Sequence, residues 1–144
     1  MQMALTLTYA DVAEGVKAAL AAYTQALDDG RTDDVVATFC PDGACEIPGL
    51  GHHRGHEALR QAYEKVTPRR PQRHLVLNTL ITEWGDTEAA AISDVVILLL
   101  GESGWTTPLV GRYHDTLLYD EGVWRFHHRA ATFVTDHPSP KGKA

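Results

Sequence analysis

The sequence has few of the features that mark metal sites, membrane spans and nucleic-acid binding. Cys40 and Cys45 are its only cysteines, too few for a zinc site built from two cysteine pairs, and we expect both to be reduced thiols in a cytoplasmic protein. The longest apolar run, residues 95–100, is far too short to cross a bilayer, and no signal peptide is recognisable. The formal net charge of -6 argues against nucleic acid as a partner, because binding phosphates requires clustered Lys and Arg.

What remains is the composition of one ordinary globular domain. The 144 residues are 44% hydrophobic and 22% charged, and no repeat or linker divides them. We therefore expect a single domain over residues 1–144. Its core should span about residues 8–135, followed by a loose tail over 136–144, where proline and lysine gather.

Helices are predicted in the first half of the chain. Apolar residues recur at helical spacing over 9–29, Thr8 and Asp11 resemble a capping box, and Gly30 is a typical helix stop. Shorter elements are predicted after this helix: a helix over 32–39 capped by Thr32 or Asp33, a turn at 41–43, a strand over 44–47 and a helix over 56–66.

The second half of the chain is predicted to be strands joined by glycine-containing turns, over 73–84, 88–100, 109–119 and 123–134. Helices followed by a meander of long strands are typical of the α+β class. Because such a sheet twists strongly, we expect a cone-shaped α+β barrel, in which three N-terminal helices pack on a strongly curved antiparallel sheet and enclose a cavity. We expect the cavity to bind a small apolar molecule. The uncovered face of the sheet predicts a homo-oligomer.

Four polar residues fall where the apolar pattern predicts burial: Tyr23, Asp28, His74 and Arg129. An aspartate bonded to one imidazole nitrogen leaves the other nitrogen free as a base, which suits Asp28 and His74. The helix macrodipole opposes a carboxylate at a helix C-terminus, so Asp28 needs a partner. Structural interpretations stay open, since a lone strand histidine is more often structural and Tyr23 can belong to the core. Tyr23 and Asp28 also point about 140° apart on a helix, so both reach one cavity only if it is wide.

Six short motifs occur in a recognisable order: ALDDG at 26–30, FCPDGA at 39–44, RGHEAL at 54–59, RHLVLN at 73–78, GRYHD at 111–115 and GVWRF at 122–126. Together they resemble the SnoaL-like group of the nuclear transport factor 2-like superfamily, over about residues 10–134. Within it, the chain looks most like scytalone dehydratase, hexachlorocyclohexane dehydrochlorinase and bile acid 7α-dehydratase. This resemblance implies an Asp–His dyad that removes a proton and expels a leaving group without a cofactor. It also implies a homotrimer, with a dimer as the alternative.

The resemblance assigns roles to single residues. His74 falls on the dyad histidine, Asp28 on the dyad aspartate, Arg129 on the active-site arginine of the dehydrochlorinase and Tyr23 on a catalytic tyrosine of the bile acid enzyme. The candidates for substrate binding are Asn78, Asp94, Tyr113 and Phe133.

Departures from the motifs argue against two of the activities found among these similar enzymes. An apolar residue near Leu99 replaces the second histidine of scytalone dehydratase, and Gly111 and Tyr113 replace its serine and asparagine. Tyr23 stands where the dehydrochlorinase has lysine. The chain is therefore predicted to be neither of these two enzymes itself.

The sequence thus predicts a cofactor-independent lyase of the dehydratase type, or an isomerase, acting on a small apolar cyclic substrate. Two alternatives stay open: a non-catalytic ligand-binding module, and a polyketide-type cyclase in which Asp94 is the base. No metal is expected, because His53 and His56 straddle Gly55 instead of sharing a helical face.

Overall fold

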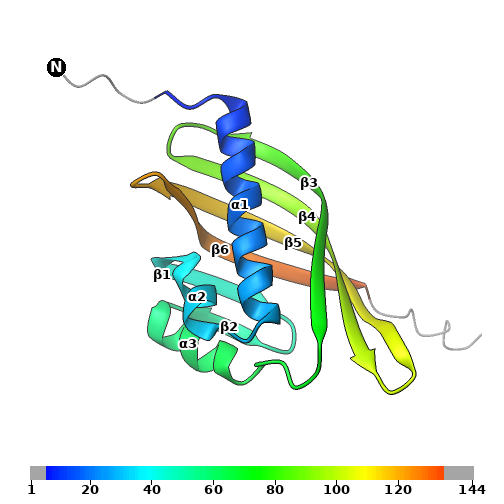
Figure 1. Ribbon diagram of the computed structural model, residues 1–144. Helices are drawn as coiled ribbons and strands as arrows, with labels where there is room; N and C mark the ends of the chain where they lie inside the picture. The colour runs from blue at the N-terminus through cyan, green and yellow to red at the C-terminus, as the bar shows by residue number, and fades with distance from the viewer. Residues whose placement is uncertain (1–5, 135–144) are drawn as a thin grey trace, which may run out of the picture.

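A computed structural model of the chain describes residues 6–134 as three helices and six strands (Figure 1). The helices are α1 (Tyr9–Asp28), α2 (Thr32–Ala37) and α3 (His56–Glu64). The strands are β1 (Phe39–Ile47), β2 (Gly51–Arg54), β3 (Gln72–Trp84), β4 (Glu88–Gly101), β5 (Gly104–Asp120) and β6 (Val123–Val134). The tail predicted at 136–144 lies outside the described residues. None of the described helices is long and apolar enough to cross a membrane.

The capping box predicted at the start of α1 is confirmed. The Thr8 hydroxyl accepts a hydrogen bond from the Asp11 backbone N–H at 3.1 Å, and the Asp11 carboxylate accepts one from the Thr8 N–H at 2.9 Å. The cap predicted for α2 is wrong, because Arg31 occupies the cap position without a side-chain hydrogen bond. Thr32 opens the helix and Asp33 lies in its first turn, where the helix dipole favours an acidic side chain.

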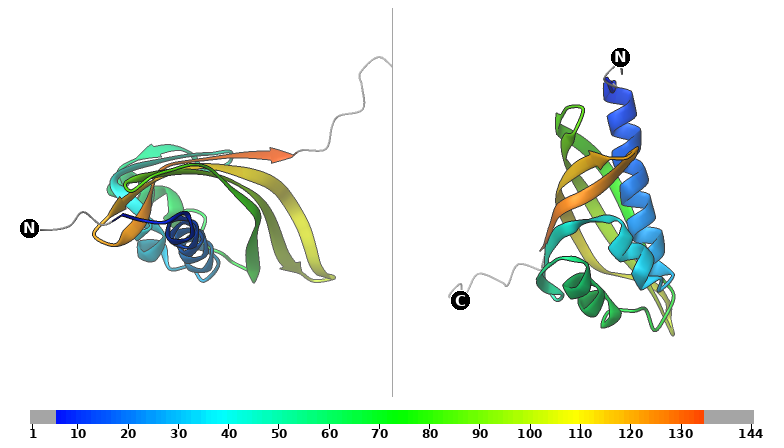
Figure 2. Two further views of the ribbon diagram at one scale, coloured as in Figure 1. Left: turned by 90° about the horizontal axis from the view of Figure 1, so that it is seen from above. Right: turned by 90° about the vertical axis from the view of Figure 1, so that its left-hand side faces the viewer.

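The six strands form one curved sheet in the order β2-β1-β6-β5-β4-β3. Neighbouring strands are antiparallel, except that β1 and β6 run parallel. Seen from above, the sheet arches over the helices (Figure 2). Its end strands β2 and β3 are not hydrogen-bonded to each other, so the predicted α+β architecture holds but the sheet is not a closed barrel. The concave side is closed by helix α1, which packs against β3 and β6, and not by pairing between β2 and β3.

β1 differs most from its prediction. The turn expected at 41–43 is part of a continuous strand, which begins at Phe39 and passes through Pro41. Pairing with the distant β6 produces this strand, with an irregularity between Phe39 and Ala44 that accommodates the proline. At Gly43, an added Cβ would lie 2.8 Å from the carbonyl oxygen of Phe126, so the close approach of the two strands requires glycine there.

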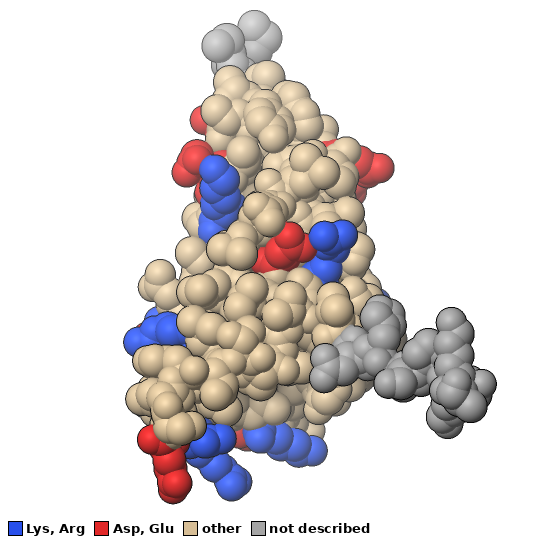
Figure 3. Space-filling view, turned by 90° about the vertical axis from the view of Figure 1, so that its right-hand side faces the viewer, with Lys and Arg blue, Asp and Glu red and all other residues tan. Residues whose placement is uncertain are grey.

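The outer face of the sheet carries an apolar row that no element of residues 6–134 covers. Leu75, Val96, Val110 and Val134 are cross-strand neighbours on β3 to β6 and form one row, in which Leu75 and Val110 are each 41% exposed. Figure 3 shows largely uncharged surface here, with an acidic and a basic group side by side near its middle. The predicted homo-oligomer stays a prediction, and so does the cytoplasmic location. Cys40 and Cys45 are both free and buried.

Candidate functional site

A cavity of about 320 Å³ lies between the helices and the concave side of the sheet. Its volume falls in the range of small-molecule binding sites. The wall is mostly apolar and includes Leu27, Ile47, Leu50, Ile97, Leu109 and Phe133. The polar side chains that line it come from α1, α3, β3 and β5 and are Tyr23, Tyr63, Gln72, His74 and Tyr113.

His74 on β3 and Asp28 at the end of α1 meet at the side of this cavity. The imidazole Nδ1 lies 2.6 Å from the Asp28 Oδ1, across 46 positions of sequence, so the contact predicted from the sequence is confirmed. The two side chains are only 10% and 5% exposed. Because an ionised carboxylate only accepts hydrogen bonds, Nδ1 carries the ring proton. Nε2 then keeps its lone pair, on a side chain that lines the cavity.

The Asp28 carboxylate is held by three donors. Besides the imidazole, the backbone N–H of His74 donates to Oδ2 at 2.8 Å, and the Gln72 amide Nε2 donates to Oδ1 at 3.2 Å. These bonds give the carboxylate the partners that its unfavourable place at a helix C-terminus requires. They also fix its plane and, through it, the orientation of the imidazole.

The cavity is also lined by three residues that the sequence predicted for catalysis or substrate binding, namely Tyr23, Tyr113 and Phe133. The Tyr23 hydroxyl lies 2.6 Å from that of Tyr63 on α3. Burial raises the pKa of both Tyr23 and Tyr63 above the ordinary range, so both hydroxyls stay protonated. Tyr23 faces the cavity, whereas Asp28 faces β3. Although the two side chains point in different directions from α1, both belong to one site, because His74 on β3 lines the cavity and contacts Asp28.

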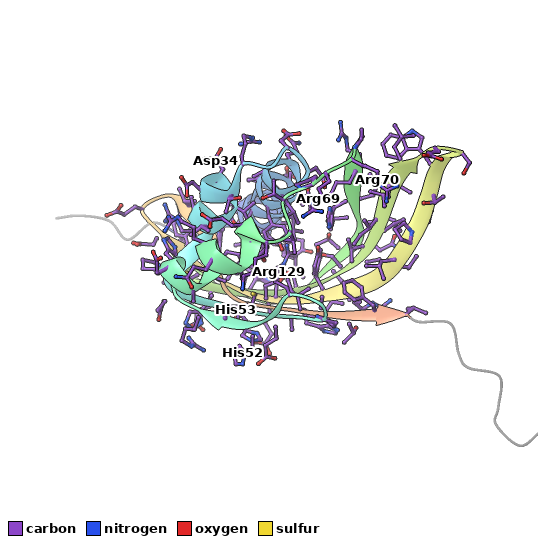
Figure 4. The ribbon with its side chains drawn as sticks, turned by 90° about the horizontal axis from the view of Figure 1, so that it is seen from below. Asp34, His52, His53, Arg69, Arg70 and Arg129 are labelled. Atoms are coloured by element: carbon purple, nitrogen blue, oxygen red, sulfur yellow. The ribbon has the colours of Figure 1, made fainter. Side chains whose placement is uncertain are left out.

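Arg129 is fully buried and lies behind the cavity wall, between the helical layer and the sheet (Figure 4). Its guanidinium donates two hydrogen bonds to Asp115, at 2.8 and 3.0 Å, and faces the rings of Tyr23 and Tyr113. Burial disfavours the charge, but attraction to Asp115 outweighs it and raises the pKa of Arg129. Its predicted role of stabilising negative charge on a substrate stays a prediction.

Asn78 and Asp94, predicted to bind substrate, lie on the outer face of the sheet, and this part of the prediction is wrong. Alternation from His74 would place Asn78 inward, but a β-bulge between Leu77 and Leu80 interrupts the pattern, and Asn78 takes a φ of 54°. Its amide donates to Asp94 at 2.9 Å, and Arg112 donates to the same carboxylate at 2.9 Å. These hydrogen bonds lower the pKa of Asp94. The cyclase alternative loses its base, since Asp94 does not reach the cavity.

The histidines near β2 do not converge on one point. The His53 ring contacts the Leu50 carbonyl oxygen at 2.8 Å, and the His56 ring contacts the Phe39 carbonyl oxygen at 2.9 Å. His52 points away from the helices (Figure 4). Over residues 6–134, no group of three or more His, Cys, Asp or Glu side chains is arranged to hold a metal ion.

Three residues of this region were not predicted from the sequence: Tyr63, Gln72 and Asp115. Gln72 had a usable signal, because it lies two positions before His74 and therefore on the same face of the strand. Tyr63 lies four residues after Leu59 on the buried side of α3, a position that reads as core. Asp115 had no signal of its own, since its partner Arg129 lies on a different strand.

Comparison with known proteins gives a family and a set of similar structures. A family model described as a SnoaL-like domain matches residues 9–130. A protein of unknown function from Mycobacterium tuberculosis is 26% identical, with a TM-score of 0.79 over 85% of this chain and 72% of that one. A candidate scytalone dehydratase from Novosphingobium aromaticivorans is 22% identical, with a TM-score of 0.76 over 92% and 95% of the two chains.

A third similar structure is the beta subunit of a candidate aromatic-ring-hydroxylating dioxygenase from the same organism. It is 19% identical, with a TM-score of 0.74 over 92% of this chain and 95% of that one. A search of curated protein sequences finds no match. At these identities the second and third structures support the fold alone.

Proposed function

Because this chain belongs to the SnoaL-like domain family of the nuclear transport factor 2-like superfamily, we propose that it is a cofactor-independent lyase of the dehydratase type, or an isomerase, acting on a small apolar cyclic substrate. The observation that carries the proposal is the His74–Asp28 contact at the wall of a mostly apolar cavity. A base in such a place is shielded from water and faces whatever the cavity holds. The alternative is a non-catalytic module that binds the same molecule without changing it.

In the proposed reaction, the Nε2 of His74 takes a proton from a carbon beside a carbonyl group or beside the carbon that bears a leaving group. The C–H electron pair forms a carbon–carbon double bond. The carbonyl oxygen then gains the negative charge, or the leaving group departs with its bonding pair. Asp28 stabilises the imidazolium, and Tyr23 donates a hydrogen bond or a proton to the oxygen. A positioned base of this kind accelerates a reaction by roughly 10²- to 10⁴-fold.

Solvent deuterium exchange tests the proposal without knowledge of the natural substrate. Incubating the protein with a panel of cyclic ketones in D₂O should incorporate deuterium beside the carbonyl of at least one compound, as measured by NMR. The exchange should slow on acidification, because a protonated imidazole cannot accept a proton. Binding of panel members with no exchange at any pH would favour the non-catalytic module instead.

Gln72 supplies a graded test of the dyad. Gln72→Leu removes one of the three donors to the Asp28 carboxylate, and we expect turnover to fall by roughly 3- to 10-fold, the loss of one ordinary hydrogen bond. Gln72→Glu should cost more, because it places a second carboxylate beside the first. Steady-state rates of both variants check this order. Equal rates in Gln72→Glu and the parent protein would contradict the proposed importance of the Asp28 environment.

We also propose that the protein is a homo-oligomer assembled through the apolar row on the outer sheet face, with a trimer favoured over a dimer by the family resemblance. Val110 lies within this row, and Asp94 and Arg112 beside it are charges of opposite sign. A second copy could therefore match both the apolar and the charged parts of the face.

Val110→Asp tests the self-association. An aspartate in the row should dissociate the assembly, because a charge would have to be buried in an apolar contact. Sedimentation velocity measures the change in mass. Val123→Asp is the matched control, since Val123 is similarly exposed but lies at the β5–β6 turn. A parent protein that already sediments as a monomer would contradict the proposal.

A further inference from the structure

The cavity opens at the end of the molecule where α3 leads into β3. Among the leucine, isoleucine, valine and aromatic side chains that line it, Val66 and Leu109 are the most exposed, at 40% and 37%. Val66 follows α3, and Leu109 lies on β5 near the β4–β5 hairpin. The opening is therefore bordered by the loop over 65–71 and by this hairpin, which places both segments beside the path of an entering ligand.

Positive charge is concentrated at this opening. Four exposed cations lie close together in the sequence, Lys65, Arg69, Arg70 and Arg73, and no acidic residue occurs from 65 to 82. Over residues 6–134, none of the four forms an ion pair with a carboxylate. Figure 3 shows basic side chains together at the lower end of the molecule, with an acidic group beside them. In a chain of net charge -6, this cluster makes a local field of the opposite sign.

The loop that carries the cations is attached to the hairpin. Pro68 and Pro71 restrict its backbone, and the Leu100 N–H of β4 donates to the carbonyl oxygen of Pro71 at 3.0 Å. A terminal nitrogen of Arg70 lies 3.6 Å from the point that a Cβ would occupy at Gly101, so its guanidinium reaches the last residue of β4. The basic loop and the tip of the hairpin therefore form one continuous surface.

An exposed tryptophan adds an apolar group to this surface. Trp105 is 53% exposed, and it pairs across the hairpin with Leu100. Tryptophan is favoured at the boundary between water and lipid, where its ring contacts acyl chains while its N–H stays hydrated. Trp105 thus lies beside the basic loop, and Val66 and Leu109 lie at the cavity opening on its other side. This end of the molecule combines cations with exposed apolar side chains.

We propose that this end of the molecule docks on the surface of a membrane that contains anionic lipid, and that the cavity receives its apolar ligand from the lipid. The docking surface consists of the loop over 65–71, Arg73 and Trp105, and it surrounds the opening at Val66 and Leu109. Anionic lipid attracts each cation of the loop, whereas the acidic remainder of the chain is repelled and turns the opening toward the membrane. Docking of this kind needs no segment that crosses the bilayer.

The apolar part of the surface favours lipid over other acidic partners. A nucleic acid or an acidic protein would match the four cations but would leave Trp105 and the apolar opening in contact with water. Lipid matches both parts, and an apolar compound is far more concentrated in lipid than in water. The inference does not depend on the proposed reaction, because a module that only binds the compound would take it up by the same route.

Vesicle flotation with the full chain tests the docking. Vesicles of phosphatidylcholine alone are compared with vesicles that contain about one third phosphatidylglycerol, and the bound fraction is measured against lipid concentration. We expect binding to the anionic vesicles to be at least roughly 10-fold stronger, and to weaken in high salt, which screens the attraction. Tryptophan emission should shift to shorter wavelength on binding. Trp105→Phe should remove this shift, because Trp84 packs against Tyr9 at the start of α1 and Trp124 is buried.

Reversal of a single charge identifies the surface that docks. Arg69→Glu should weaken binding to anionic vesicles by roughly 10- to 30-fold, because it replaces an attraction with a repulsion. Lys17→Glu is the matched control, since it makes the same change of net charge at a 60% exposed cation in the middle of α1. We expect the control to weaken binding by less than about 2-fold, because Lys17 lies away from the docked end.

Several results would overturn the docking: no binding of the parent protein to anionic vesicles, equal binding to both kinds of vesicle, equal losses in Arg69→Glu and Lys17→Glu, or an emission shift that persists in Trp105→Phe. Binding to DNA or to polyglutamate without binding to vesicles would assign the cations to a different partner and overturn it as well. Deuterium exchange of a soluble ketone should be unchanged in Arg69→Glu, so docking and catalysis are measured separately. Thermal unfolding of each variant shows that the fold is retained.

Discussion

Asp28→Asn should lower turnover by roughly 10³- to 10⁴-fold while leaving the fold intact. The backbone N–H of His74 faces one carboxylate oxygen at 2.8 Å and can only donate. It therefore holds the oxygen of the asparagine amide on its own side, and the NH₂ group is turned toward Nδ1 of the imidazole. Nδ1 must then accept a hydrogen bond, so the ring proton moves to Nε2. The nitrogen that faces the cavity is no longer a base.

Two comparisons make this prediction specific. His74→Ala should lose as much activity as Asp28→Asn, and the double variant should lose little more, because the two residues act as one unit. Asp29→Asn is the control, since it removes a negative charge at the same helix end but its carboxylate is half exposed and lies 3.5 Å from Arg31. Rates from the exchange assay and circular dichroism of each variant provide the measurement. Full activity in Asp28→Asn would remove the dyad mechanism.

Arg129→Met should reduce the free energy of unfolding by about 3–5 kcal/mol, the usual cost of breaking a buried ion pair by removing one partner. The Asp115 carboxylate would be left buried without its two hydrogen bonds from the guanidinium. The rings of Tyr23, Tyr113 and Phe126 would also lose the cation that they surround, at 3.6 to 4.3 Å from their centres. Urea denaturation measures the loss.

The double variant Arg129→Met with Asp115→Leu distinguishes a structural role from a catalytic one. Replacing both partners leaves no unpaired charge, so much of the stability should return. If this variant folds and keeps its activity, Arg129 acts by holding the cavity wall. If it folds but loses activity, the guanidinium contributes to catalysis, as the family resemblance implies. A double variant less stable than either single one would contradict the ion-pair explanation.

Local signals in the sequence were sufficient for most of the fold. Helix α1 begins at its capping box and ends near Gly30. Three of the four long strands lie within one residue of their predicted bounds, whereas β5 begins five residues before its predicted start. β1 was predicted only in part, because its first half is a strand by virtue of pairing with β6, more than 80 positions away. A turn sequence such as Pro41-Asp42-Gly43 cannot report such a partner.

The sequence predicted only part of the candidate site. His74 and Asp28 stood out because polar residues interrupted apolar patterns, and a family resemblance joined them. Asn78 was misplaced because a β-bulge between Leu77 and Leu80 shifts the alternation of faces, until a second irregularity between Ile81 and Glu83 shifts it again. Tyr63 was missed because a buried tyrosine in an amphipathic helix is indistinguishable from core until its hydroxyl is seen to face another.

The amino-acid sequence by itself determined the class of fold, the succession of its elements and the two polar residues, Asp28 and His74, that meet beside the cavity. These depend on periodicity, caps and turns, which act over a few residues. Only the tertiary structure decided which face of the sheet each polar residue occupies, that Arg129 pairs with Asp115, and that two tyrosine hydroxyls meet in the cavity. Such contacts depend on strand register and on the packing of α1 and α3 against the sheet, and both arise from pairings between distant parts of the chain.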